Sequence, residues 1–171
     1  MKTLAAVLLV LGVTSCNREE RAPAMQTTES HSPLELVREY VERDSRGERL
    51  RTAPWFLSVV TWLEDPAFDS YTVIAGFQVG QLAQTGDSAT VAVTYQRLGW
   101  IQTTGRNTVR FVPSDTVERY DFRLSMSTGR WLITQPRLEP HVLVDTVLAA
   151  PPLGAADRDT LQARRSTVRR P

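Results

Sequence analysis

The chain has 171 residues, enough for one domain of ordinary size, and 42% of them are apolar. Twenty Lys and Arg residues against 19 Asp and Glu residues give a net charge of +1, so no global basic field predicts nucleic-acid binding. Cys16 is the only cysteine, and one thiol cannot form a disulfide within the chain or a cysteine-based zinc site.

The first segment of the chain has the pattern of a signal peptide. Met1 and Lys2 precede an apolar run from Leu4 to Val13, and two small residues stand directly before Cys16. The run is too short to span a bilayer, which needs about 20 apolar residues. The pattern resembles the lipobox of bacterial lipoproteins, which implies cleavage before Cys16 and acylation of this residue. The alternative is an ordinary secretory signal with an incidental cysteine.

The sequence as a whole divides into four parts. We expect a signal peptide over 1–15, the lipidated cysteine and a flexible tether over 16–31, an α+β domain over 32–148, and a disordered Arg-rich tail over 149–171. Asn17 follows Cys16, and by resemblance to enterobacterial sorting this favours the periplasmic face of the outer membrane. The tail has two interpretations, a solvated chain end or a basic arm for anionic headgroups.

Two helices are predicted at the start of the domain. Ser32 and Glu35 form a capping box around Pro33, apolar residues from Leu34 to Val41 recur at helical spacing, and Gly47 is suited to the helix end. A second helix is expected from Pro54, through a segment to Leu63 that is apolar nearly all round. We expect that helix to be buried, and Asp65-Pro66 to end it.

Beyond the second helix the apolar period changes from helical to two, which predicts strands. The alternating segments are Tyr71–Val79, Thr90–Trp100, Tyr120–Leu124 and Arg130–Thr134. Hairpin turns are predicted at Thr85-Gly86-Asp87 and Ser127-Thr128-Gly129, and Gly76 and Gly80 would permit a bulge. The segment between Gln102 and Asp115 is a long excursion, either a mobile flap or a short edge strand.

This order of elements resembles the nuclear transport factor 2-like, or cystatin-like, α+β family. The opening helix over 34–44 and the closing strand over 129–133 carry the resemblance. It implies N-terminal helices packed on a strongly curved, cone-like antiparallel sheet. The alternative is another two-layer α+β sandwich. Enzymes of the family place an acidic base and a tyrosine, or a second acid, in the cone.

Several residues could form a pocket in such a cone. The acids and tyrosines that could take part in chemistry are Asp65, Asp69, Tyr71, Asp115, Tyr120 and Asp121, although no spacing singles out any of them. The candidate pocket residues are Trp55, Trp62, Tyr71, Phe77 and Tyr95, with Asp69 and Asp121. The alternative is that the aromatic residues form a solid core and the acids lie in turns or in solvent.

We therefore predict a membrane-anchored, non-catalytic module that binds an envelope protein or a small apolar ligand. One alternative is an isomerase- or cyclase-type enzyme that uses a buried carboxylate. Another is a dimerisation or assembly module, which implies a homodimer. No cofactor or metal is predicted, because His31 and His141 are far apart in the sequence and no acidic segment has calcium-loop spacing.

Overall fold

The computed structural model describes residues 31–51, 55–65, 68–104, 109–150 and 153–168. The predicted signal peptide, Cys16 and all of the tether except His31 lie outside the described residues. Among the described helices, none is both long enough and apolar enough to cross a membrane.

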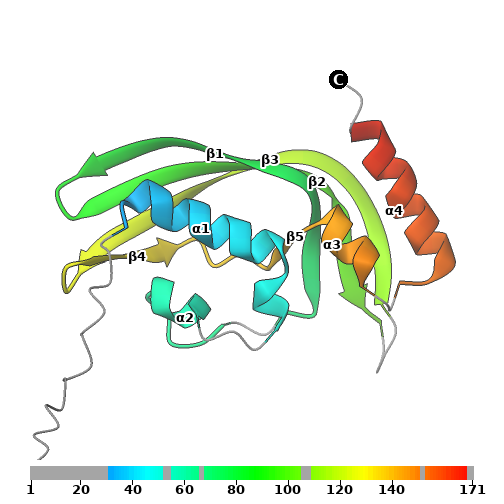
Figure 1. Ribbon diagram of the computed structural model, residues 1–171, viewed down its shortest axis with the longest axis horizontal. Coiled ribbons are helices and arrows are strands. Elements are labelled where there is room, and N and C mark those ends of the chain that lie inside the picture. The colour runs from blue at the N-terminus through cyan, green and yellow to red at the C-terminus, as the bar shows by residue number, and fades with distance from the viewer. Residues whose placement is uncertain (1–30, 52–54, 66–67, 105–108, 151–152, 169–171) are drawn as a thin grey trace, which may run out of the picture.

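The described residues form an α+β fold with a strongly curled, mixed five-stranded sheet (Figure 1). The strand order is β4-β3-β2-β1-β5. In chain order the elements are α1 (Pro33–Ser45), the 3-10 helix η1 (Glu48–Leu50), α2 (Trp55–Val59), β1 (Ser70–Thr85), β2 (Ser88–Thr103), β3 (Val109–Ser127), β4 (Arg130–Gln135), β5 (His141–Leu143), α3 (Val144–Ala149) and α4 (Ala155–Val168).

The prediction of an α+β fold is confirmed, but the prediction of a purely antiparallel sheet is wrong. The first four strands pair antiparallel, whereas β5 pairs parallel with β1 at Thr72, Val73 and Ile74. A three-residue strand carries too little periodicity to be detected in a sequence. Its position depends on contacts between segments that are far apart in the chain.

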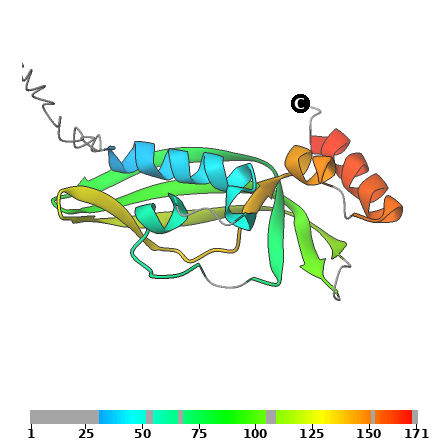
Figure 2. The same ribbon diagram turned by 60° about the horizontal axis from the view of Figure 1, so that its bottom comes forward.

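The predicted start of α1 is confirmed in detail. The Glu35 backbone N–H donates to the Ser32 hydroxyl oxygen at 3.3 Å, and the Ser32 N–H donates to the Glu35 carboxylate at 2.9 Å. Gly47 follows the helix with a φ of +74°, a left-handed conformation that glycine adopts without strain. The helix lies lengthwise against the concave face of the sheet (Figure 2).

The second helix is shorter than predicted. It covers only Trp55–Val59, and Leu63 is 95% exposed rather than buried. Val60 instead forms a bridge with Ile133 of β4, and the Thr61 N–H donates to the Ile133 carbonyl at 3.0 Å. The chain leaves the helical conformation here because these backbone groups pair with the edge of the sheet.

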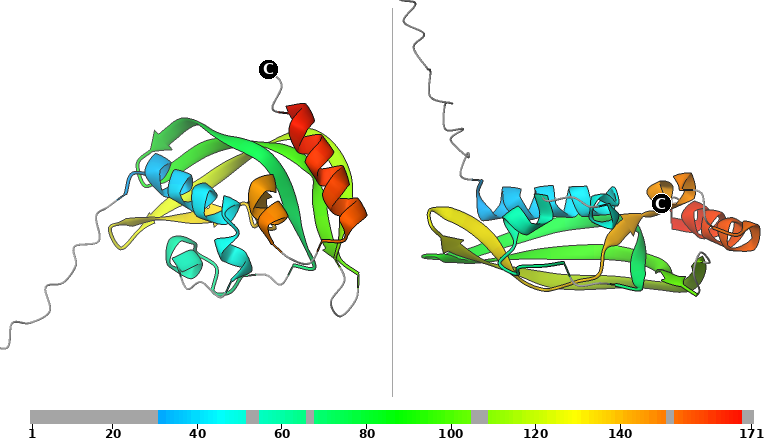
Figure 3. Two further views of the ribbon diagram at one scale, coloured as in Figure 1. Left: turned by 45° about the vertical axis from the view of Figure 1, so that its right-hand side comes forward. Right: turned by 90° about the horizontal axis from the view of Figure 1, so that it is seen from below.

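Bulges in β1 and β2 accompany the bending of the sheet (Figure 3). Register shifts occur around Gly76 and between Val79 and Leu82, as the two glycines of β1 predicted. A further shift occurs at Gly99, which has a φ of +151°. The predicted excursion between 102 and 115 is largely strand, since β2 continues to Thr103 and β3 begins at Val109. Residues 105–108 lie outside the described residues.

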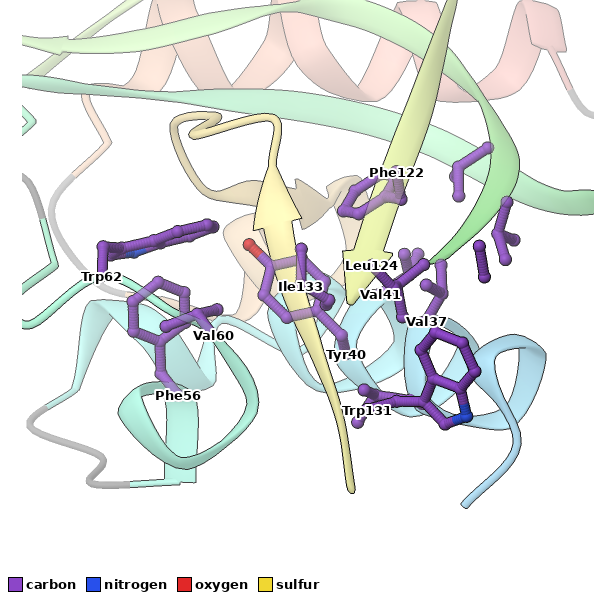
Figure 4. Close-up of a cluster of buried hydrophobic side chains, with 14 of the residues drawn as sticks. Val37, Tyr40, Val41, Phe56, Val60, Trp62, Phe122, Leu124, Trp131 and Ile133 are labelled. Atoms are coloured by element: carbon purple, nitrogen blue, oxygen red, sulfur yellow. The ribbon is translucent and has the colours of Figure 1, made fainter. Parts of the chain in front are cut away.

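Two clusters of buried apolar side chains hold the layers together. In the first, residues of α1, α2 and the segment after α2 meet the concave face of β1 to β4 (Figure 4). In the second, residues of α3 and α4 cover Val73, Leu98, Ile101 and Phe111 of the sheet. Neighbouring residues of β1 belong to different clusters, Val73 to the second and Ile74 to the first.

The C-terminal region differs from the predicted disordered tail over 149–171. Residues 155–168 form α4, and Leu161 is completely buried. Leu153, which precedes α4, also belongs to the second cluster, and Val168 packs against it, seven positions after Leu161 on the same helix. The low overall hydrophobicity of the segment hid this spacing.

Replacing Leu161 with Ala tests whether α4 is docked. We expect a loss of about 2–5 kcal/mol in the free energy of unfolding, because the change leaves a cavity in the second cluster. Gln162→Ala is the control, since Gln162 is exposed on the same helix. Denaturant unfolding measures both variants, and equal stabilities would show that α4 does not pack on the sheet.

Replacing Gly99 with Ala tests the bulge in β2. A Cβ at Gly99 would meet the Val112 carbonyl oxygen at 2.2 Å and the Phe111 ring at 2.7 Å, in a backbone conformation that L residues rarely adopt. We expect a loss of about 3 kcal/mol or more. Gly76→Ala is the matched control, because nothing lies within 4 Å of its added Cβ. Thermal unfolding should separate the two variants clearly, and a stable Gly99→Ala chain would contradict this local geometry.

Candidate functional site

A buried arginine organises the end of the domain beyond α1. Arg49 comes from η1, and its side chain is 1% exposed. Its Nε and Nη2 donate to the two carboxylate oxygens of Asp65 at 3.2 and 2.7 Å. Nη1 donates to the Tyr40 hydroxyl at 3.0 Å, and Nη2 also donates to the Leu138 carbonyl at 3.1 Å. Four of the five guanidinium N–H groups therefore donate to partners from three other segments of the chain.

Asp44 lies next to this arginine and is 2% exposed. One carboxylate oxygen accepts a hydrogen bond from the His141 backbone N–H at 2.9 Å. The other lies 3.7 Å from Arg49 Nη1 and has no hydrogen-bond partner among the described residues. Burial raises the pKa of Asp44 to about 7, although the Arg49 charge acts in the opposite direction.

His141 is buried against the same cluster. Its Nδ1 lies 2.8 Å from the Glu139 carbonyl oxygen, which can only accept, so Nδ1 carries the proton in the neutral ring. Nε2 has no partner among the described residues, and the ring centre lies 4.3 Å from that of Tyr95. Burial lowers the pKa of His141 to about 4. The imidazole is therefore neutral at physiological pH.

A cavity of about 390 Å³ opens beside this cluster. It is lined by Arg49, Leu50, Asp65, Phe68, Asp69, Ser70, Tyr71, Thr103 and Pro140. Leu50 is 49% exposed and Phe68 is 37% exposed, so the lining includes accessible apolar surface. Within the part of the chain that the structure describes, no hydrogen bond or ion pair engages the Asp69 carboxylate. The cavity thus combines the Arg49–Asp65 ion pair, the Asp69 carboxylate, which has no partner among the described residues, and apolar surface.

The structure brings two of the seven predicted pocket residues together, since Asp69 and Tyr71 both line this cavity. Trp55, Trp62, Phe77 and Tyr95 contribute to the first apolar cluster instead. The indole N–H groups of Trp55 and Trp62 lack acceptors among the described atoms, and Arg43 lies over the Trp55 ring at 4.3 Å.

Two of the remaining predicted acids lie away from the cavity. Asp121 is exposed on β3, 3.8 Å from Arg119, and Asp115 pairs with Arg164 of α4. Asp65, in contrast, lines the cavity as the partner of Arg49. Tyr120 donates to Glu118 at 3.3 Å, next to the pair that Glu118 forms with Arg97.

Sequence reasoning missed Asp44, Arg49 and His141 as parts of one cluster. One signal for Asp44 was present, because it follows Val37 by seven residues and Tyr40 by four, which places it on the buried side of α1. A carboxylate at such a position needs a buried partner. Nothing in the local sequence indicates that the partners are Arg49 and the backbone of His141.

No family model matches the chain, and no curated protein and no solved structure shows significant similarity to it. Among the described residues, no group of three or more His, Cys, Asp and Glu side chains is placed to hold a metal ion.

Asp44 and His141 should give the stability of the domain opposite dependences on pH. From about pH 4 to 7 the folded state holds a proton on Asp44 that the unfolded state has lost, so this group stabilises the fold as pH falls. From about pH 6.5 to 4 the unfolded state protonates His141 and the folded state does not, so this group destabilises the fold as pH falls. The two effects oppose each other in the parent chain.

Single substitutions should separate these two effects. Relative to the parent, Asp44→Asn should lose stability as pH falls from 6.5 to 4, and His141→Gln should gain it as pH falls from 7 to 4. Each relative slope should be at most roughly 1.4 kcal/mol per pH unit. Denaturant unfolding at several pH values measures the slopes, and three parallel curves would show that neither group has a shifted pKa.

Proposed function

We propose that this chain is a lipid-anchored protein of the bacterial envelope, and that its α+β domain is a non-catalytic binding module. The observation that carries the binding role is the cavity, which combines apolar surface with the free carboxylate of Asp69. The sequence around Cys16 supports the anchored location. The packing of α1 in the concavity of a curled sheet supports a cone-like, nuclear transport factor 2-like arrangement.

The position of the cavity relative to the predicted tether suits this role. The tether joins the domain at Ser32, where α1 begins, whereas Arg49 and Leu50 of the cavity follow the other end of the helix. A helix of 13 residues is about 20 Å long. The cavity therefore lies at the end of the domain away from the proposed anchor.

The charges of the lining favour a ligand with a cationic group. Arg49 and Asp65 neutralise each other, and the Asp69 carboxylate has no charged partner among the described residues. Arg49 offers no free N–H group to an anion, because the hydrogen bonds and the ion pair described above engage it. Leu50 and Phe68 can contact a short apolar body. A small alkylammonium or alkylguanidinium group fits this chemistry.

The alternative is an isomerase- or cyclase-type enzyme, and one observation supports this alternative. Asp44 is a buried carboxylate with a raised pKa next to Tyr40, as such a base requires. It is not among the residues that line the cavity, however, so a ligand there would meet Arg49 and Asp65 instead. This arrangement supports binding over catalysis by Asp44.

A set of probes matched in size and different in charge tests the proposal. We expect butylammonium to perturb the NMR signals of Tyr71 and Thr103, and butyrate and butanol to bind more weakly. Asp69→Asn should weaken butylammonium binding roughly tenfold, because it removes the unpaired charge. Asp121→Asn is the control, an exposed acid outside the cavity lining. Preference for butyrate would contradict the ligand class, and the failure of all three probes would argue against the cavity as a site.

A further inference from the structure

The first strand of the sheet contains no charged residue and no proline. This holds for all 16 residues of β1 from Ser70 to Thr85, in a chain of which 23% is charged. At that frequency, about four charged residues would be expected in a segment of this length. The absence is informative because β1 has a long free edge.

Only the first part of β1 is paired on both sides. The strand pairs with β2 along its length, but β5 covers only Thr72, Val73 and Ile74. From residue 75 to residue 85, no described residue forms a ladder with the outer edge of β1. Gln78 and every residue from Gly80 to Thr85 are exposed, and β1 follows the rim of the sheet (Figure 1).

The opposite edge of the sheet is protected. β4 has six residues, and Val60 and Thr61 pair with it at Ile133. Natural proteins usually guard free edges with charges, prolines, bulges or covering segments, because an unguarded edge pairs with another chain. β1 has only one of these devices beyond Ala75, the bulge between Val79 and Leu82. Regular stretches of four residues remain on each side of it, 76–79 and 82–85.

We propose that the free edge of β1 over residues 75–85 pairs with the same edge of a second copy of this chain. A two-fold axis brings two identical edges together in antiparallel orientation. Two uncharged edges meet without placing like charges opposite each other. The edge also carries no charged residue that would recognise a charged partner of another kind. The two five-stranded sheets then form one continuous sheet across the axis.

The contact between the two copies should be weak on its own. One additional strand pair buries a small area, below the roughly 1,200 Å² that marks the lower limit of standard interfaces. Confinement on a membrane raises the effective concentration of the partner copy and favours such a contact. That last step rests on the proposed lipid anchor, whereas the pairing of the edges does not.

Cysteine crosslinking of the full chain in the membranes of producing cells tests the pairing. Single cysteines at Gln78, Gln81, Leu82 and Gln84 should yield disulfide-linked dimers with a maximum at the position nearest the two-fold axis. Asp121→Cys on β3 is the control for random collision, and the unsubstituted chain is the control for Cys16. Equal crosslinking at Asp121 and along β1, or none along β1, would overturn the proposal.

Charge substitutions provide the second test. The pair Gln78→Lys and Gln84→Lys, added to the cysteine variant that links best, should reduce crosslinking roughly tenfold, because the two paired edges would then bring four positive charges together. Co-expression with a copy that carries Glu at both positions should restore it. Unchanged thermal unfolding would show that the fold is intact. Dimers that persist in the Lys variant would place the interface elsewhere and overturn the proposal. Binding of butylammonium is independent of this result.

Discussion

The buried guanidinium of Arg49 is the constraint on which the candidate site depends. An arginine cannot lose its charge inside a protein, so every N–H group must find an acceptor when the side chain is 1% exposed. Tyr40 of α1, Asp65 and the Leu138 carbonyl accept four hydrogen bonds from Arg49, and they come from three separate segments. The same contacts hold the end of α1, the chain before β1 and the loop before β5 in one place. The cavity is bounded by these three segments, so its shape follows from the requirement to satisfy one charge.

The carboxylates around Arg49 outnumber the cation, and this excess has consequences for stability and for binding. Arg49 compensates Asp65 in a bidentate pair and approaches Asp44 only at 3.7 Å. Burial raises the pKa of Asp44, the nearby Arg49 charge opposes this shift, and the Asp65 carboxylate adds a smaller contribution that raises the pKa further. Asp69 adds a third carboxylate at the cavity wall. The excess of carboxylates is the basis of the proposed preference of the cavity for cations.

The parts of the fold that the sequence predicted are those with local causes. The capping box at Ser32 and Glu35 and the turns at Gly86 and Gly129 each depend on a few adjacent residues, and all are present. The errors concern contacts between distant segments. The second helix ends early because Val60 pairs with Ile133, and the position of β5 depends on pairing with β1. The site has the same origin, since Arg49 and Asp65 are 16 positions apart, and Asp44 meets the backbone of a residue 97 positions away. Asp69 and Tyr71 could be named from composition alone, but not as neighbours of Arg49.

The two proposed surfaces can function at the same time because they occupy different parts of β1. Ser70 and Tyr71 line the cavity at the start of the strand, whereas the free edge begins at residue 75 and extends to the hairpin. The start of α1 lies toward the same end as the hairpin between β1 and β2 (Figure 2). An antiparallel pair of β1 edges would therefore place the two cavities at opposite ends of the joined sheet, each accessible to ligand. Pairing of the edges leaves both cavities uncovered, because no residue of the cavity lining belongs to the free edge.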